Sequence, residues 1–288
     1  MSKWYTHYVI YRTLTFNVEY KAESPIRVGS GKAIKLTSPI DLPVLTIKID
    51  GEDVPYIPGS SLKGVFRATA EHIARTHEIY TCERGEGCMK KYGKRLQKQL
   101  EIGDLNRILE ILNEYCIICK CFGSGTFSSH IHFHDAYPIK GFSKELKTGI
   151  AIDRRSGTVK RGAGTVKKGA LYTIEYVSPG AIFLGKITLI NIPNYIVGLL
   201  GNVIQQINLG IVKIGGMKSR GFGSTSISIK NATGFIYEDN SIKMVKGEVT
   251  LKALDEFDEE VTLNSDKPMD YFIKSMEAWS KYVKSRKS

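Results

Sequence analysis

The sequence lacks several features that would place it in whole classes of protein. No stretch of its 288 residues approaches the roughly 18–20 uninterrupted apolar residues that a membrane-spanning helix needs. Its first residues, MSKWYTHYVIYRTLTF, have no apolar core followed by a small-residue cleavage site, which argues against secretion. A hydrophobic content of 42% with 10% aromatic residues excludes a disordered basic tail. We therefore expect a cytoplasmic protein without a membrane partner, built from one large domain or two small ones.

Cysteines are few, and their spacing favours metal binding over disulfide bonds. There are five, an odd number, and four of them form two spaced pairs. These four are Cys82, Cys88, Cys116 and Cys119. Four thiolates in such pairs suit a closed tetrahedral structural zinc site that holds together an insertion over residues 77–125. The alternative is a set of buried free cysteines.

Two further residues near these pairs need an assignment. Cys121 is left over and is expected to serve as a small hydrophobic side chain. His77 is a possible substitute ligand for one of the cysteines. The histidines at 130, 132 and 134 alternate along an expected strand, where they fit a polar sheet face better than a metal site.

Acidic residues are scarce where basic residues gather. The chain has 41 Lys and Arg against 29 Asp and Glu, a net charge of +12. Between Lys140 and Lys168, nine basic residues face only Glu145 and Asp153, so this segment carries +7. It is also rich in glycine, which predicts an extended hairpin able to follow a phosphate backbone, or else a solvated linker. A second basic cluster, Lys90–Lys98, has helical spacing.

The hydrophobic periodicity predicts an α+β fold. Alternation predicts strands at Thr13–Tyr20, His130–Tyr137, Leu171–Val177, Ala181–Ile190 and Thr225–Ile229. The third and fourth are expected to form a hairpin through Pro179-Gly180. Helices are expected after a Ser60 or Ser61 N-cap, twice within 77–125, and at Pro193–Leu209 and Asp266–Lys287. Without the insertions this is a ferredoxin-like β-α-β-β-α-β order over residues 1–240, followed by a C-terminal extension at 241–288.

Two segments are candidates for phosphate contact. A glycine-rich loop follows the second core helix and has neither the P-loop spacing nor the position of a dinucleotide fingerprint. Its candidate RNA-binding residues are Gly215, Gly216, Lys218, Ser219, Arg220, Gly221 and Gly223. The helix start Ser60-Ser61 offers free N–H groups to an anion, and Lys63 and Arg67 are four residues apart on one face.

Five motifs together carry a specific resemblance. They are YIPGSSLKGVFR (56–67), CIICKCFGS (116–124), HFHDAYP (132–138), IDRRSGT (152–158) and IGGMKSRGFG (214–223). In this order they resemble the RAMP superfamily, and most closely the backbone subunit of type III CRISPR effector complexes. The resemblance covers about residues 14–230 and leaves the chain after 240 uncovered.

The resemblance implies an RNA-guided function. The family's backbone subunits bind a guide crRNA, assemble with other copies, paralogues and further effector subunits, and kink the pairing with target RNA through a thumb-like hairpin. Here the thumb would span residues 152–168, with Arg154, Arg155, Lys160 and Arg161. Lys32 completes the expected RNA-binding set.

The resemblance also implies cleavage of the target RNA by attack of its own 2′-OH, assisted by Mg²⁺ or Mn²⁺. The Asp-X-Pro pattern of the loop before the Pro-Gly-Ser-Ser helix places the catalytic acid at Asp41. Asp50 and Asp53 are nearby acids that could be mistaken for it.

Three alternatives remain open from the sequence. The first is the same scaffold as a structural RNA-binding subunit without cleavage. The second is a stand-alone guide-processing ribonuclease, which would normally use a histidine as acid and base. Neither the 56–67 motif nor the glycine-rich loop contains one. The third is zinc-dependent DNA recognition, for which the finger spacing is missing.

Overall fold

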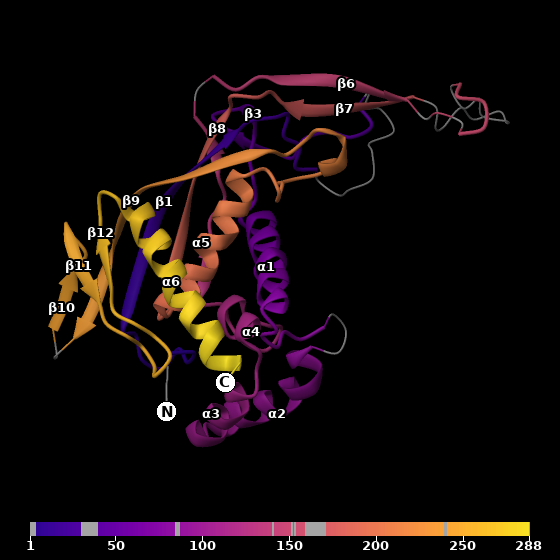
Figure 1. The fold of residues 1–288 in the computed structure, drawn as a ribbon. Helices are drawn as coiled ribbons and strands as arrows, with labels where there is room; N and C mark the ends of the chain where they lie inside the picture. Colours follow the sequence, from indigo (N-terminus) through magenta and orange to yellow (C-terminus); the bar gives the residue numbers. More distant parts are fainter. Residues whose placement is uncertain are drawn as a thin grey trace.

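A computed structural model describes residues 4–29, 40–83, 87–139, 141–150, 152, 154–158, 171–238 and 241–287. The fold is α+β, with helices packed on one antiparallel sheet (Figure 1). The strand order is β10-β9-β1-β8-β4, and β5 also pairs with β8. These strands are β1 (Arg12–Ala22), β4 (Ile131–Phe133), β5 (Tyr137–Pro138), β8 (Ile182–Ile190), β9 (Thr225–Glu238) and β10 (Ser241–Met244).

Strand β1 lies at the centre of the sheet because every second residue is apolar and buried. Leu14, Phe16 and Val18 are each at most 1% exposed, and the residues between them are partly exposed. β1 pairs antiparallel with β8 from Thr13↔Ile190 onward, and antiparallel with β9 on its other side. The sequence prediction of a strand here is confirmed.

Three long helices cover the buried face of the sheet. They are α1 (Gly59–Thr76), α5 (Asn194–Asn208) and α6 (Pro268–Lys287). In Figure 1, α5 lies between α1 and α6, and it is buried on almost every side. The helices predicted at these three places are confirmed. One detail is wrong: α1 begins at Gly59 after Pro58, so neither Ser60 nor Ser61 is the N-cap residue.

The C-terminal segment packs into the same core. Phe272 of α6 contacts Phe16 of β1, with ring centroids 5.0 Å apart. Asp258 precedes α6 and accepts hydrogen bonds from the backbone N–H groups of Asn194 and Tyr195, at 2.8 and 3.3 Å, so it caps α5. Residues on either side of Asp258 form a small hairpin of β11 (Glu248–Leu251) and β12 (Val261–Asn264).

Two further hairpins lie outside the main sheet. One is β2 (Thr46–Ile49) with β3 (Glu52–Pro55), and the other is β6 (Lys144–Ile150) with β7 (Leu171–Val177), which projects from the body of the protein (Figure 1). The expected hairpin between Leu171–Val177 and Ala181–Ile190 is therefore wrong. The turn at Gly180 (φ 90°) carries the chain from β7 into the main sheet, where β8 pairs with β1 instead.

The insertion at 77–125 is helical. It contains α2 (Cys88–Ile102), α3 (Leu105–Asn113) and the short α4 (Ile117–Phe122). Asp104 caps α3 by accepting from the N–H of Arg107 at 3.1 Å. The predicted strand His130–Tyr137 is interrupted: β4 ends at Phe133 and β5 begins at Tyr137.

The close packing of α5 on α6 gives a stability test. A Cβ added at Gly198 would lie 1.9 Å from the carbonyl oxygen of Ser275. We expect Gly198→Ala to lower the free energy of unfolding by about 3 kcal/mol or more, since α6 must move away. Gly64→Ala is the matched control, because nothing lies within 4 Å of its added Cβ. It should raise the stability by about 0.5–1 kcal/mol. Urea unfolding of both variants measures the difference, and equal stabilities would contradict the packing.

Candidate functional site

A groove of about 910 Å³ joins three segments that are far apart in the sequence. It lies between the loop that carries Asp41, the exposed side of α1 and the glycine-rich loop. Its polar lining residues are Arg27, Asp41, Ser61, Thr69, His72, Lys213 and Lys218. Three of these are cations, so the groove suits a polyanion.

Asp41 is held at the groove by β7. One carboxylate oxygen accepts a hydrogen bond from the backbone N–H of Thr173 at 2.8 Å. The neighbouring Leu42 exchanges backbone hydrogen bonds with β7, donating to Thr173 and accepting from Glu175. Asp50 and Asp53 do not line this groove; they lie on the β2–β3 hairpin, where Asp53 forms an ion pair with Lys48 at 3.4 Å.

Arg27 ties the Asp41 loop to the glycine-rich loop. Its guanidinium donates to the carbonyl oxygens of Leu42 and Pro43, at 3.1 and 3.3 Å. Its own carbonyl oxygen accepts from the N–H of Gly216 at 2.7 Å. Gly215 has φ +91°, and a Cβ there would lie 2.4 Å from the same carbonyl. The loop can approach Arg27 this closely only because that position is glycine.

Some of the predicted glycine-loop residues line the groove, and others stabilise the loop itself. Gly215, Gly216 and Lys218 line the groove, and Lys218 begins a 3-10 turn that runs through Ser219 to Arg220. Arg220 turns away to β7 and donates to the hydroxyl of Tyr172 at 2.6 Å.

Two glycines close the loop. Gly223 bonds through its backbone to Ile214 and Pro25, which anchors the C-terminal end. Gly221 has φ +83° with no atom near its missing Cβ, so it serves the turn.

Helix α1 presents only part of its predicted binding set to the groove. Ser61 lines it, whereas Ser60 is exposed outside it and Lys63 is half-buried. Burial and the nearby Arg67 lower the pKa of Lys63. The N–H of Gly59 donates to Asp135 at 2.7 Å, so the helix start is capped by a carboxylate from the HFHDAYP motif. An anion at this end would therefore meet a negative charge.

The thumb residues are only partly described. Arg154 and Arg155 are exposed beyond the end of β6. Lys32, Lys160 and Arg161 lie outside the described residues. The basic cluster with helical spacing lies on α2, and its five residues are all exposed: Lys90, Lys91, Lys94, Arg95 and Lys98.

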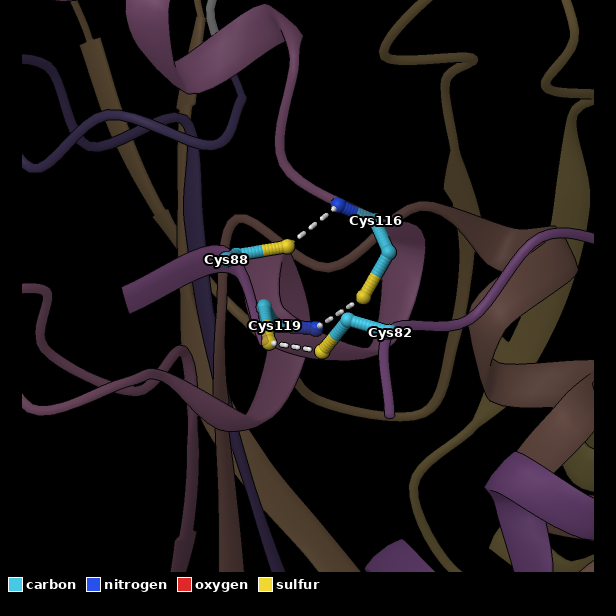
Figure 2. A group of neighbouring side chains, drawn as sticks. All are labelled: Cys82, Cys88, Cys116 and Cys119. Atoms are coloured by element: carbon cyan, nitrogen blue, oxygen red, sulfur yellow. Dashed lines mark hydrogen bonds between the residues drawn. The ribbon is translucent and has the colours of Figure 1, made fainter. Parts of the chain in front are cut away.

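Four cysteine side chains converge at a second site (Figure 2). The sulfur atoms of Cys82, Cys88, Cys116 and Cys119 all lie within 4.8 Å of one another. Backbone N–H groups support two of them: Cys116 N–H donates to Cys88 Sγ at 3.2 Å and Cys119 N–H to Cys116 Sγ at 3.5 Å. Cys88, Cys116 and Cys119 are buried, and Cys82 is half-buried.

The electrostatics of this cluster favour a bound cation. Hydrogen bonds from Cys119 and Cys88 lower the pKa of Cys116, and the pKa of each donor thiol is raised in return. A divalent ion with thiolate affinity would remove the repulsion among neighbouring thiolates, and four sulfurs at this spacing, three of them on buried residues, fit tetrahedral Zn²⁺.

Residues expected beside the cluster fall outside it. Cys121 is buried at 1% exposure and is not among the converging sulfurs, which confirms its role as a small hydrophobic residue. His77 packs against Trp279 of α6 instead. His130 is fully buried and stacked on His7, so it does not lie on a polar sheet face as predicted.

Comparison with known families decides the classification. The family model described as RAMP superfamily matches residues 19–226. The chain belongs to the RAMP superfamily. Members of this superfamily are CRISPR-associated RNA-binding proteins that work with crRNA in effector complexes. No curated protein matches the chain. Among the described residues, no helix is long and apolar enough to cross a membrane.

Three residues with basic side chains in this RAMP protein's groove were not predicted from the sequence. His72 follows the 56–67 motif by five residues and lines the groove from α1. Lys213 precedes the glycine-rich loop, and Arg27 stands near the start of a segment without periodicity. Only Lys213 had a signal in the sequence, as a further cation beside a glycine-rich loop.

The cysteine site predicts a difference between two buried cysteines. Cys88→Ala removes one of the four converging sulfurs, so we expect zinc content well below that of the unchanged protein and a lower stability. Cys121→Ala, the matched control, should keep its zinc and lose only about 1 kcal/mol of stability from the lost packing. Zinc per chain is measured by atomic absorption after gel filtration. Equal zinc in both variants would contradict the site.

Proposed function

We propose that this protein is a guide-RNA-binding backbone subunit of a type III CRISPR effector complex, and that it cleaves complementary target RNA at regular intervals. The observation that carries the proposal is the groove, because it brings Asp41, the side of α1 and the glycine-rich loop together. The resemblance to type III backbone subunits rests in part on the α1 motif and on the glycine-rich loop. It assigns the catalytic acid to the loop that carries Asp41.

The groove supports contact with the RNA backbone. Lys218 and Lys213 supply positive charge, and the glycine-rich loop allows phosphates to approach backbone N–H groups. Lys213 also donates to the carbonyl oxygen of Lys218 at 3.0 Å, which holds the two cations on one side of the groove. Such contacts are independent of sequence, as a subunit that accepts any guide requires.

The projecting β6–β7 hairpin is the proposed thumb. The N-terminal end of its strand β7 borders the groove, since Asp41 bonds to Thr173, Leu42 to Thr173 and Glu175, and Arg220 to Tyr172. Arg154 and Arg155 lie beyond the end of β6. A hairpin attached at the acid's own loop would fix where along the RNA the cut falls.

The proposed cleavage uses the target's own nucleophile. The 2′-oxygen bonds to the adjacent phosphorus, the 5′-oxygen of the next nucleotide leaves, and a cyclic phosphate remains. Asp41 Oδ2 accepts from Thr173, and its other oxygen, Oδ1, is the atom that would orient the 2′-hydroxyl or receive its proton. Asp41 is also the residue that would hold Mg²⁺ or Mn²⁺, whose charge would offset that of the phosphate.

We also infer a ferredoxin-like core. In the order β9-β1-β8-β4 the first and third core strands are neighbours at the centre, and α1 and α5 cover one face. The cysteine cluster would be a structural zinc site of the 77–125 insertion. The segment 241–287 was expected to be an extension outside the core. Its helix α6 packs on α5, so we infer that it is also part of the core.

One observation favours a second candidate, the same subunit without cleavage. The hydrogen bond from Thr173 gives Asp41 a structural task, which is to join its loop to β7. In that case the carboxylate would matter for RNA binding through the shape of the groove and not for chemistry.

Substitution of Asp41 separates these two candidates. In an assembled complex with guide RNA and Mg²⁺ or Mn²⁺, Asp41→Asn should leave target binding intact and abolish the ladder of evenly spaced products. The amide keeps an oxygen to accept from Thr173, so the loop is retained. Asp53→Asn is the control and should cleave normally. Unchanged cleavage by Asp41→Asn would support the non-catalytic role of this residue.

Substitution of Lys218 tests the groove as the RNA-binding surface. Lys218→Ala should weaken RNA binding equally across sequences and reduce the slope of log affinity against log salt by about 1, as loss of one phosphate contact predicts. Lys98→Ala removes an equally charged exposed residue from α2 and should leave the slope unchanged. Filter binding of single-stranded RNA at several salt concentrations measures both. The same slope for Lys218→Ala as for the unchanged protein would exclude this contact.

A further inference from the structure

Helix α1 separates two hollows in the structure. On one side lies the groove, and on the other a cavity of about 500 Å³ that opens beside Cys82, Cys88 and Cys119. Gly64 and Ala68 line both hollows. The helix is therefore a shared wall, and its cavity side includes Arg67 and Glu71.

The guanidinium of Arg67 is directed to the cysteine cluster. It donates to Cys119 Sγ at 3.4 Å and to the carbonyl oxygen of Gly123, just after α4, at 3.0 Å. Its Nε–H donates to Glu71 at 3.0 Å, one helical turn along α1. These contacts differ from the prediction that Arg67 follows an RNA strand beside Lys63. The side chain is only 31% exposed, and each of its three nitrogen atoms already has a partner in the protein.

A second arginine on the same helix face reaches the other cysteine pair. Arg75 donates to the hydroxyl of Thr81 at 2.6 Å and to the carbonyl oxygen of Cys82 at 3.1 Å. Arg67, Glu71 and Arg75 are spaced four residues apart, so they share one side of the helix. This side holds the Cys82 segment through Arg75 and the Cys119 segment through Arg67.

We propose that Arg67 is a positioning residue of the metal centre and also offsets its charge. The inference rests on the proposed zinc site. Four thiolates around Zn²⁺ carry a net double negative charge in a largely buried place. Of the cationic side chains in the described ranges, only Arg67 has a hydrogen bond to a cysteine sulfur. Such outer partners of metal ligands fix the geometry of a site and raise its affinity.

The test compares three full-length variants loaded with Zn²⁺. Arg67→Gln removes the charge, Arg67→Lys keeps it, and Arg107→Gln is the control. Arg107 lies on α3 of the same insertion, where it forms an exposed ion pair with Glu110 at 2.7 Å. The readout is the transfer of Zn²⁺ to a chromogenic chelator at equilibrium. Arg67→Gln should lose about 10–100-fold in Zn²⁺ affinity. Arg67→Lys should recover part of the loss, and Arg107→Gln should match the unchanged protein.

The absorption spectrum of the Co²⁺-substituted protein distinguishes altered metal coordination from a loss of folding. Co²⁺ in place of Zn²⁺ gives absorption bands that report tetrahedral thiolate coordination. Arg67→Gln saturated with Co²⁺ should show four thiolates with shifted bands, because the hydrogen bond to Cys119 Sγ is gone. An affinity and a spectrum identical to those of the unchanged protein would overturn the role of Arg67. Failure of the unchanged protein itself to bind Zn²⁺ or Co²⁺ would instead overturn the proposed zinc site.

Discussion

Helix α1 is fixed at its first turn by the carboxylate of Asp135 and along its length by packing of Phe66 on Phe133, whose ring centroids are 4.9 Å apart. Both candidate sites are built on the surface that this packing leaves. One side faces the groove through Ser61 and His72, and another faces the cysteine cluster. A shift of this helix would therefore alter both sites together, and both contacts that fix it come from residues 133–135.

Residues of the same charge have different tasks in this protein, and burial distinguishes them. Lys218 lies on an exposed turn at the groove, where water and a phosphate can both reach it. Arg67 has the same formal charge but lies under the insertion with its donors bonded to protein atoms. A net charge of +12 thus overstates the positive charge that is available to RNA. RNA binding depends on cations that, like Lys218, are exposed at the groove.

The sequence predicted the cysteine cluster and the three core helices because each depends on a strong local rule. Closely spaced cysteine pairs are typical of tetrahedral metal sites. An apolar stripe at helical spacing is typical of a helix that packs on a core. The capping of α1 by Asp135 was not predicted, because Gly59 and Asp135 are 76 residues apart and no local sequence pattern links them. The β7–β8 hairpin was wrong for the same reason. A turn at Gly180 shows that the chain reverses, but the partner of each strand is decided by distant residues.

The central position of β1 has a consequence for how the chain assembles during synthesis. β1 is synthesised before α1, yet both of its neighbours, β8 and β9, follow the whole 77–125 insertion in the chain. Helix α5 is buried on nearly all sides, and the side that faces α6 stays uncovered until α6 has been made. Until these partners have been made, the nascent chain carries first an unpaired strand and then an exposed hydrophobic helix face, and both kinds of surface favour aggregation.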